Sequence, residues 1–206
     1  PVKNKKNLLT QILFFIYFVL LYNLIVKYMK KIIITFTCLL MLGSANAQVF
    51  NTGSTLKPKD FSLGVEPAVI INGNADFILF LHGGYGLTKG IDFGLTFGVL
   101  GPFNYFGGDV EFMVHKNMSL AFGAHHFGRF GLDGTFLATF PIGGVVNVFG
   151  GLDLDVNISK DTDFLLWLPI GVEVGIRKGM SFIFEAQVGL TKPAYHLIGG
   201  GVNFYF

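Results

Sequence analysis

The sequence has little cysteine and little charge: of its 206 residues, one is a cysteine and 14% are charged. The cysteine, Cys38, lies in an apolar run before residue 48, so the rest of the chain can form no disulfide within itself. Basic residues are also scarce after residue 47, where nine lysines and arginines stand against 13 acidic residues, a net charge of −4. This acidic balance argues against nucleic acid as a partner.

Long helix-like apolar runs occur only in the first quarter of the chain, where they predict a leader. Residues 29–47 combine two early lysines, a short apolar core and a terminal Ala-Asn-Ala, the three parts of a cleaved secretory signal peptide. A retained membrane anchor is the alternative, although the apolar core is short for a span. Residues 1–28 are expected to be either upstream sequence translated in error or an additional hydrophobic helix.

The rest of the chain is rich in glycine and phenylalanine, of which the whole sequence has 28 and 24. Residues 48–60 are polar and aperiodic, and are expected to form a periplasmic lead-in. From Phe61 onward, apolar residues alternate with Gly, Asn, Ser, Asp or Glu, which gives each strand one face for hydrocarbon and one for a polar interior. We therefore predict an all-β fold over residues 61–206, an up-and-down antiparallel transmembrane β-barrel.

The alternation divides into ten segments, most with the length of about 9–11 residues that a tilted membrane-spanning strand needs. They are expected at 61–71, 75–88, 91–100, 105–114, 118–128, 132–142, 145–157, 164–176, 180–191 and 196–206. Pro67, Pro141 and Pro169 fall within these segments, where the missing N–H predicts a bulge or a strand end. These prolines leave an eight-stranded barrel open as the alternative.

Three of the connections share a weak repeat, apolar-x-Lys-[Gly/Asn]-[Ile/Met]-[Asp/Ser]-[Phe/Leu], which begins at Leu87, Val114 and Ile176. Gly or Asn after the lysine is expected to supply the positive φ of a tight hairpin turn. With Gly143-Gly144 these make four short turns, which ten strands would place in the periplasm together with both ends of the barrel. The five other connections, also short, are expected on the outside.

The inward-facing positions carry many carboxylates and, at mid-depth, no lysine or arginine. The carboxylates predicted to line the lumen are Glu66, Asp92, Asp109, Glu111, Asp153, Asp155, Glu173 and Glu185, with Asp76 and Asp133 on the same parity. Unpaired charges are costly in a dry interior, so the lumen is expected to be partly wet. Because rings of Asp and Glu select cations, a narrow pore for cations or small polar solutes is predicted. A structural envelope barrel with an occluded lumen is the alternative.

A lipid-modifying outer-membrane enzyme is a less favoured alternative, suggested by the inward parity of His82, His115 and His125. Such an enzyme needs a nucleophile held by a histidine and a carboxylate, but no His-x-Ser-Asn motif surrounds His125. His126 cannot join His125 at one metal ion, because adjacent residues of a strand point to opposite faces. The chain is therefore predicted to be no enzyme and to hold no metal and no cofactor.

The signal peptide, the Gly- and Phe-rich hairpins with Lys-Gly turns and the terminal Asn203-Phe204-Tyr205-Phe206 resemble small outer-membrane β-barrel proteins of Gram-negative bacteria, especially the porin-like group of Bacteroidota. The resemblance covers residues 48–206 and is one of pattern. It implies secretion to the outer membrane, with membrane lipid, periplasmic chaperones and the barrel assembly machinery as partners, and leaves the oligomeric state open. In that family a lipid-facing C-terminal aromatic is part of the assembly signal, which Phe204 and Phe206 match.

Overall fold

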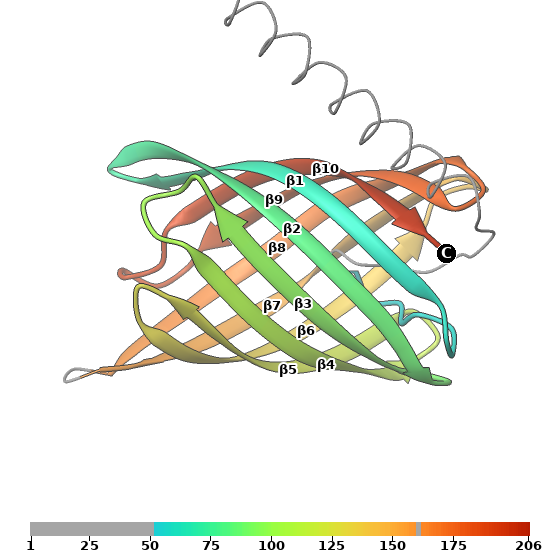
Figure 1. Cartoon of the computed structure of the whole chain (residues 1–206), viewed down its shortest axis with the longest axis horizontal. Coiled ribbons are helices and arrows are strands. Elements are labelled where there is room, and N and C mark those ends of the chain that lie inside the picture. The colour runs from blue at the N-terminus through green and yellow to red at the C-terminus, as the bar shows by residue number, and fades with distance from the viewer. Residues whose placement is uncertain (1–51, 160–161) are drawn as a thin grey trace, which may run out of the picture. The chain divides into compact units, whose positions relative to one another are not determined.

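The computed structural model describes residues 52–159 and 162–206, which form a closed antiparallel β-barrel (Figure 1). Its strands are β1 (Phe61–Asn72), β2 (Asn74–Thr88), β3 (Ile91–Val99), β4 (Tyr105–His115), β5 (Met118–Phe127), β6 (Phe130–Pro141), β7 (Val146–Ile158), β8 (Asp163–Arg177), β9 (Met180–Gly189) and β10 (His196–Tyr205). Each strand pairs with its neighbours in the sequence, and β10 closes the barrel against β1.

The predicted ten-stranded antiparallel barrel is confirmed, and the eight-stranded alternative is wrong. The first and last residues of every predicted strand lie within two residues of the observed bounds. The agreement is close because alternation marks a strand clearly wherever one face is apolar. No helix of residues 52–159 and 162–206 is long and apolar enough to span a membrane. The leader and signal peptide expected in residues 1–47 lie outside the described residues.

Of the three prolines in the predicted strands, each expected at a bulge or a strand end, one lies at a strand end, and the other two lie at interrupted pairing without a bulge. Pro141 is the last residue of β6, as a strand end predicts. Pro67 lies between the paired residues Val65 and Ala68, where the ladder between β1 and β10 is interrupted without a change of register. Pro169 lies at a similar interruption between β7 and β8. At Pro67 and Pro169 the missing N–H therefore coincides with a local gap in one ladder, and the closed barrel tolerates it.

Bulges occur instead at the repeated lysine turns. The register shifts fall between Gly86 and Thr88, Met113 and His115, and Gly175 and Arg177. In each case the skipped residue is the apolar first residue of the repeat, Leu87, Val114 or Ile176. Gly90 and Gly179 have φ of 82° and 76°, as predicted, whereas Asn117 is not among the positive-φ residues of the described chain. The repeat thus corresponds to a bulged hairpin.

The outer face of the barrel is apolar and the inner face is buried. In β1 every second residue from Ser62 to Ile70 is buried, while the residues between them are exposed. Large exposed side chains continue around the wall, among them Phe97, Phe122 and Phe184. A soluble monomer rarely exposes so extended an apolar surface, and hydrocarbon is the environment that suits it.

Candidate functional site

The lumen contains an acidic cavity of about 170 Å³. Its lining carboxylates are Glu66, Asp92, Asp109, Glu111, Asp133, Asp153, Asp155 and Glu185. His82 and His125 also line it, and none of its described lining residues is a lysine or an arginine. Seven of the eight predicted lumen carboxylates therefore surround one cavity, together with Asp133.

The remaining predicted carboxylate, Glu173, lies elsewhere. It lines a second cavity beside the Lys178–Gly179 turn and is 7% exposed. Its carboxylate accepts hydrogen bonds from Asn147 Nδ2 at 2.9 Å and from the Tyr205 hydroxyl at 3.0 Å. These two hydrogen bonds satisfy the buried carboxylate and tie together β7, β8 and β10.

Strand register places three of the cavity aspartates in one row around the wall. Asp109 of β4 lies opposite Gly123 of β5, and Gly123 lies opposite Asp133 of β6. Asp133 in turn lies directly opposite Asp155 of β7. A Cβ at Gly123 would clash with the Asp133 carboxylate and with the Cβ of Asp109, so this glycine makes room for the row.

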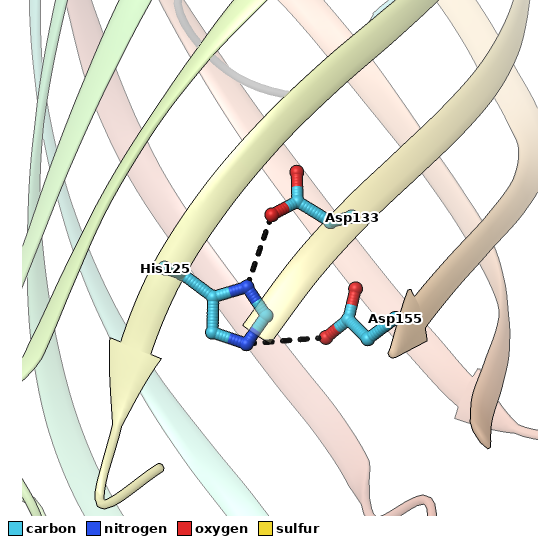
Figure 2. A group of neighbouring side chains, drawn as sticks. All are labelled: His125, Asp133 and Asp155. Atoms are coloured by element: carbon cyan, nitrogen blue, oxygen red, sulfur yellow. Dashed lines mark hydrogen bonds and ion pairs between the residues drawn. The ribbon is translucent and has the colours of Figure 1, made fainter. Parts of the chain in front are cut away.

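His125 lies beside this row, held between two carboxylates (Figure 2). Its Nδ1 is 3.0 Å from Asp133 Oδ1, and its Nε2 is 3.6 Å from Asp155 Oδ2. The ring stacks on Tyr105 with centroids 5.5 Å apart, and the residue is 7% exposed. A Cβ at Gly131, directly opposite on β6, would meet the imidazole ring, so this position must also stay open.

Replacing Gly131 with alanine should therefore push the imidazole out of place. We expect the free energy of unfolding to fall by about 1–3 kcal/mol, the usual cost of overpacking. Gly134→Ala on the same strand is the matched control, because a Cβ there meets only Phe122 at an ordinary 3.8 Å. Urea unfolding of both variants in detergent micelles measures the difference, and equal losses would contradict this account of Gly131.

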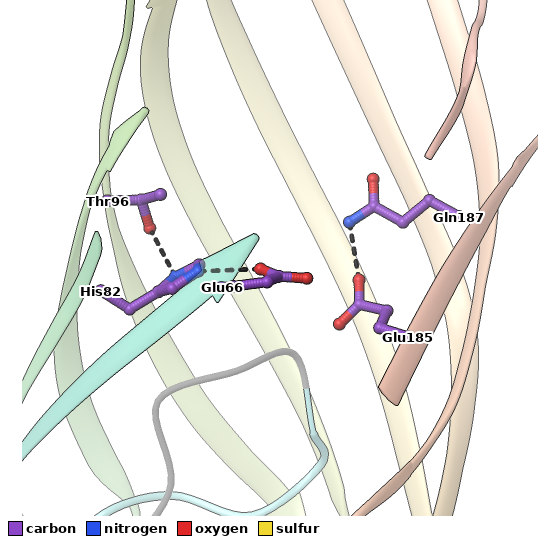
Figure 3. Close-up of polar contacts among 5 residues, drawn as sticks. All are labelled: Glu66, His82, Thr96, Glu185 and Gln187. Atoms are coloured by element: carbon purple, nitrogen blue, oxygen red, sulfur yellow. Dashed lines mark hydrogen bonds and ion pairs between the residues drawn. The ribbon is translucent and has the colours of Figure 1, made fainter. Parts of the chain in front are cut away.

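A second polar group connects β1, β2 and β3 (Figure 3). His82 Nε2 is 3.0 Å from Glu66 Oε2, and its Nδ1 is 3.3 Å from Thr96 Oγ1. Glu185 of β9 accepts a hydrogen bond from Gln187 Nε2 at 2.7 Å. Both ring nitrogens of His82 thus lie at hydrogen-bond distance from a neighbouring side chain, which distinguishes it from His125.

The three other histidines, His115, His126 and His196, do not line the cavity. His126 is exposed and faces away from the lumen, as the opposite parity to His125 predicts. His115 is exposed as well, so its predicted inward orientation is wrong. The bulge at Val114 explains the error, because one extra residue reverses the parity of every side chain that follows it.

An aromatic layer, made of Phe80, Tyr105, Phe127, Trp167 and Tyr195, crosses the lumen toward the end opposite the lysine turns. Successive ring centroids along it are 5.6, 6.0, 6.1 and 5.4 Å apart in the order Phe80, Tyr105, Phe127, Tyr195, Trp167. These residues come from β2, β4, β5, β8 and the β9–β10 connection, so side chains from opposite walls meet. Buried Ala68, Ile70, Ile78 and Leu197 pack with this layer.

The lead-in segment is described from residue 52 to residue 60, and its residues 52–56 occupy the lumen at the other end, whereas residues 57–59 are exposed. Thr52 and Leu56 are each 1% exposed. The backbone N–H of Gly53 donates to Thr139 Oγ1 at 2.8 Å, and that of Leu56 donates to Asp92 Oδ2 at 2.6 Å. The segment therefore runs from β6 to β3 inside the barrel, a placement that the sequence did not predict.

The predicted assembly signal lies at the closing strand. Phe204 and Phe206 have the outward parity and are partly exposed, whereas Asn203 and Tyr205 point inward and are 0% and 6% exposed. The role of Phe204 and Phe206 in assembly stays a prediction.

No protein-family model and no curated protein matches the chain. Solved structures that resemble it include the N-terminal β-barrel domain of Pseudomonas aeruginosa OprF, at 17% identity and a TM-score of 0.36, over 72% of this chain and 98% of that one. The outer membrane protein OprG from Pseudomonas aeruginosa matches at 12% identity and 0.37, over 73% and 97%. Neisserial surface protein A matches at 14% and 0.37, over 71% and 96%. At these values the likeness carries no argument about function.

Proposed function

We propose that this chain is an integral outer-membrane β-barrel with a closed lumen and a structural role in the bacterial envelope. The observation that supports closure best is the filling of the lumen from both ends. The aromatic layer brings side chains of opposite walls together at one end, and the lead-in segment lies inside the other. The interior of a barrel of about eight strands is filled by side chains, and a ten-stranded barrel is only slightly wider.

The outer-membrane location is supported by the fold and the outer surface together. A closed barrel leaves no unpaired strand edge, and its exposed apolar side chains match a hydrocarbon environment. Secretion through the expected signal peptide, assembly by chaperones and the barrel assembly machinery, and the Bacteroidota lineage are parts of the same proposal.

A narrow cation-favouring pore is the second candidate, and the acidic cavity is the observation that favours it. Its described lining has eight carboxylates and no lysine or arginine. The negative charge of such carboxylates would attract cations. Conduction would require both the aromatic layer and the lead-in segment to move aside. The contacts of the aromatic layer and of the lead-in segment therefore agree better with a closed lumen than with a pore.

Solute uptake by whole cells tests this function. We expect the chain, expressed in a porin-deficient Gram-negative host, to fractionate with the outer membrane and to leave the uptake of small sugars and metal cations unchanged. Deletion in its own host should increase sensitivity to detergents, and re-expression should restore resistance. Increased cation uptake on expression would instead support the pore, and recovery in the inner membrane or the soluble fraction would contradict the location.

A further inference from the structure

We propose that His125 and Asp155 bind a divalent transition-metal ion such as Zn²⁺ inside the lumen, with Asp133 holding the imidazole in place (Figure 2). One ligand atom from each of the three lies within 4.8 Å of the others. Imidazole nitrogen and carboxylate oxygen are ligands that zinc takes in proteins. The site does not depend on whether the barrel conducts, since the argument rests on contacts within β5, β6 and β7.

The spacing of His125 and Asp155 suits two ligands of one ion. Their Nε2 and Oδ2 atoms are 3.6 Å apart, which is longer than a hydrogen bond. Two ligand atoms bound to zinc at about 2.0–2.2 Å and a tetrahedral angle lie roughly 3.4 Å apart. Asp155 is 9% exposed, and its carboxylate points toward His125 Nε2 (Figure 2).

Asp133 orients the imidazole for this role. Its Oδ1 lies 3.0 Å from His125 Nδ1, so Nδ1 can donate its proton there and leave the Nε2 lone pair facing Asp155. A metal-binding histidine usually donates its second N–H to a carboxylate or a carbonyl in this way. His82 differs, because Glu66 already lies at a hydrogen-bond distance of 3.0 Å from its Nε2.

The register supplies an electrostatic reason for a cation at this place. Asp133 and Asp155 are direct cross-strand partners, and like charges in that position destabilise a sheet. Both line the acidic cavity, whose described lining has no lysine or arginine to balance them. A bound dication would convert this repulsion into attraction and offset the cost of burying the two carboxylates.

Zinc binding to the purified barrel tests the proposal. The chain is refolded in detergent micelles with Zn²⁺ present, so that the closed lumen cannot prevent loading, and bound metal is measured by equilibrium dialysis and elemental analysis. We expect one equivalent of zinc. His125→Gln and Asp155→Asn should each lower the affinity by more than about tenfold, and Asp133→Asn by about 10–100-fold. Co²⁺ as a probe should give the absorption spectrum of a tetrahedral site.

His82→Gln is the matched control, because it removes the other cavity histidine and should leave zinc affinity unchanged. Circular dichroism shows whether each variant has refolded as a barrel. Two results would overturn the proposal: no stoichiometric zinc in the wild-type chain, or the same affinity in the wild type and in a folded His125→Gln, Asp155→Asn double variant. Neither result bears on the closed lumen, which the uptake experiment tests separately.

Discussion

Replacing Leu56 with glutamate should expel the lead-in segment and open the lumen at the end where the lysine turns lie. Leu56 is 1% exposed and lines the acidic cavity. Its backbone N–H donates to Asp92 Oδ2, so a new carboxylate would be buried close to an existing one. An uncompensated buried charge costs about 3–5 kcal/mol, which exceeds what a few backbone hydrogen bonds return.

Chemical labelling of the lumen measures this opening. The barrel sequence has no cysteine of its own, so a Thr96→Cys variant in a Cys38→Ser background offers one inward-facing thiol. We expect a membrane-impermeant maleimide to label it at least tenfold faster in Leu56→Glu than in the wild type. Leu56→Met, which keeps an apolar side chain of similar volume, should stay protected. Equal labelling of all three chains would show that Leu56 does not close the lumen.

Replacing Trp167 with alanine should cause the largest loss of stability in the barrel. Trp167 is 2% exposed, lies edge-on to Tyr195 with ring centroids 5.4 Å apart, and donates a hydrogen bond from Nε1 to the Tyr195 carbonyl at 2.7 Å. Truncating such a side chain removes apolar contacts, leaves a cavity and orphans the carbonyl. We expect the free energy of unfolding to fall by about 3–5 kcal/mol.

Urea unfolding of the protein in micelles compares this variant with Trp167→Phe. The phenylalanine keeps most of the ring contact and loses the hydrogen bond, so its loss should be clearly smaller, near the roughly 1–3 kcal/mol of an unsatisfied buried group. A loss below about 1 kcal/mol for Trp167→Ala would mean that the aromatic layer contributes little to the barrel.

The sequence predicts the strands well because membrane strands alternate strictly. Parity alone identified Asp109, Asp155 and Glu185 as inward residues, and the structure places all three around the cavity. Parity fails where the backbone departs from the ladder. The bulge at Val114 turned His115 outward, and bulges depend on how a turn closes rather than on the pattern of the strand.

Contacts between strands could not be predicted in the same way. The approach of Asp133 to Asp155 depends on the register of β6 against β7, and a shift of two residues would preserve the parity and separate them. The lead-in segment has no periodicity, and its place in the lumen depends on distant partners such as Thr139. The aromatic layer likewise combines residues from strands that are far apart in the sequence.

Ion conductance of the wild-type chain in planar lipid bilayers tests the closed lumen most directly. The purified barrel is inserted in symmetrical salt and recorded at several voltages, with an open porin inserted under the same conditions as the positive control. We predict no channel events from the wild-type barrel, and none from the Leu56→Glu variant, in which the aromatic layer still closes the other end. Steady cation-selective conductance through the wild-type barrel would contradict a lumen closed by the aromatic layer and the lead-in segment.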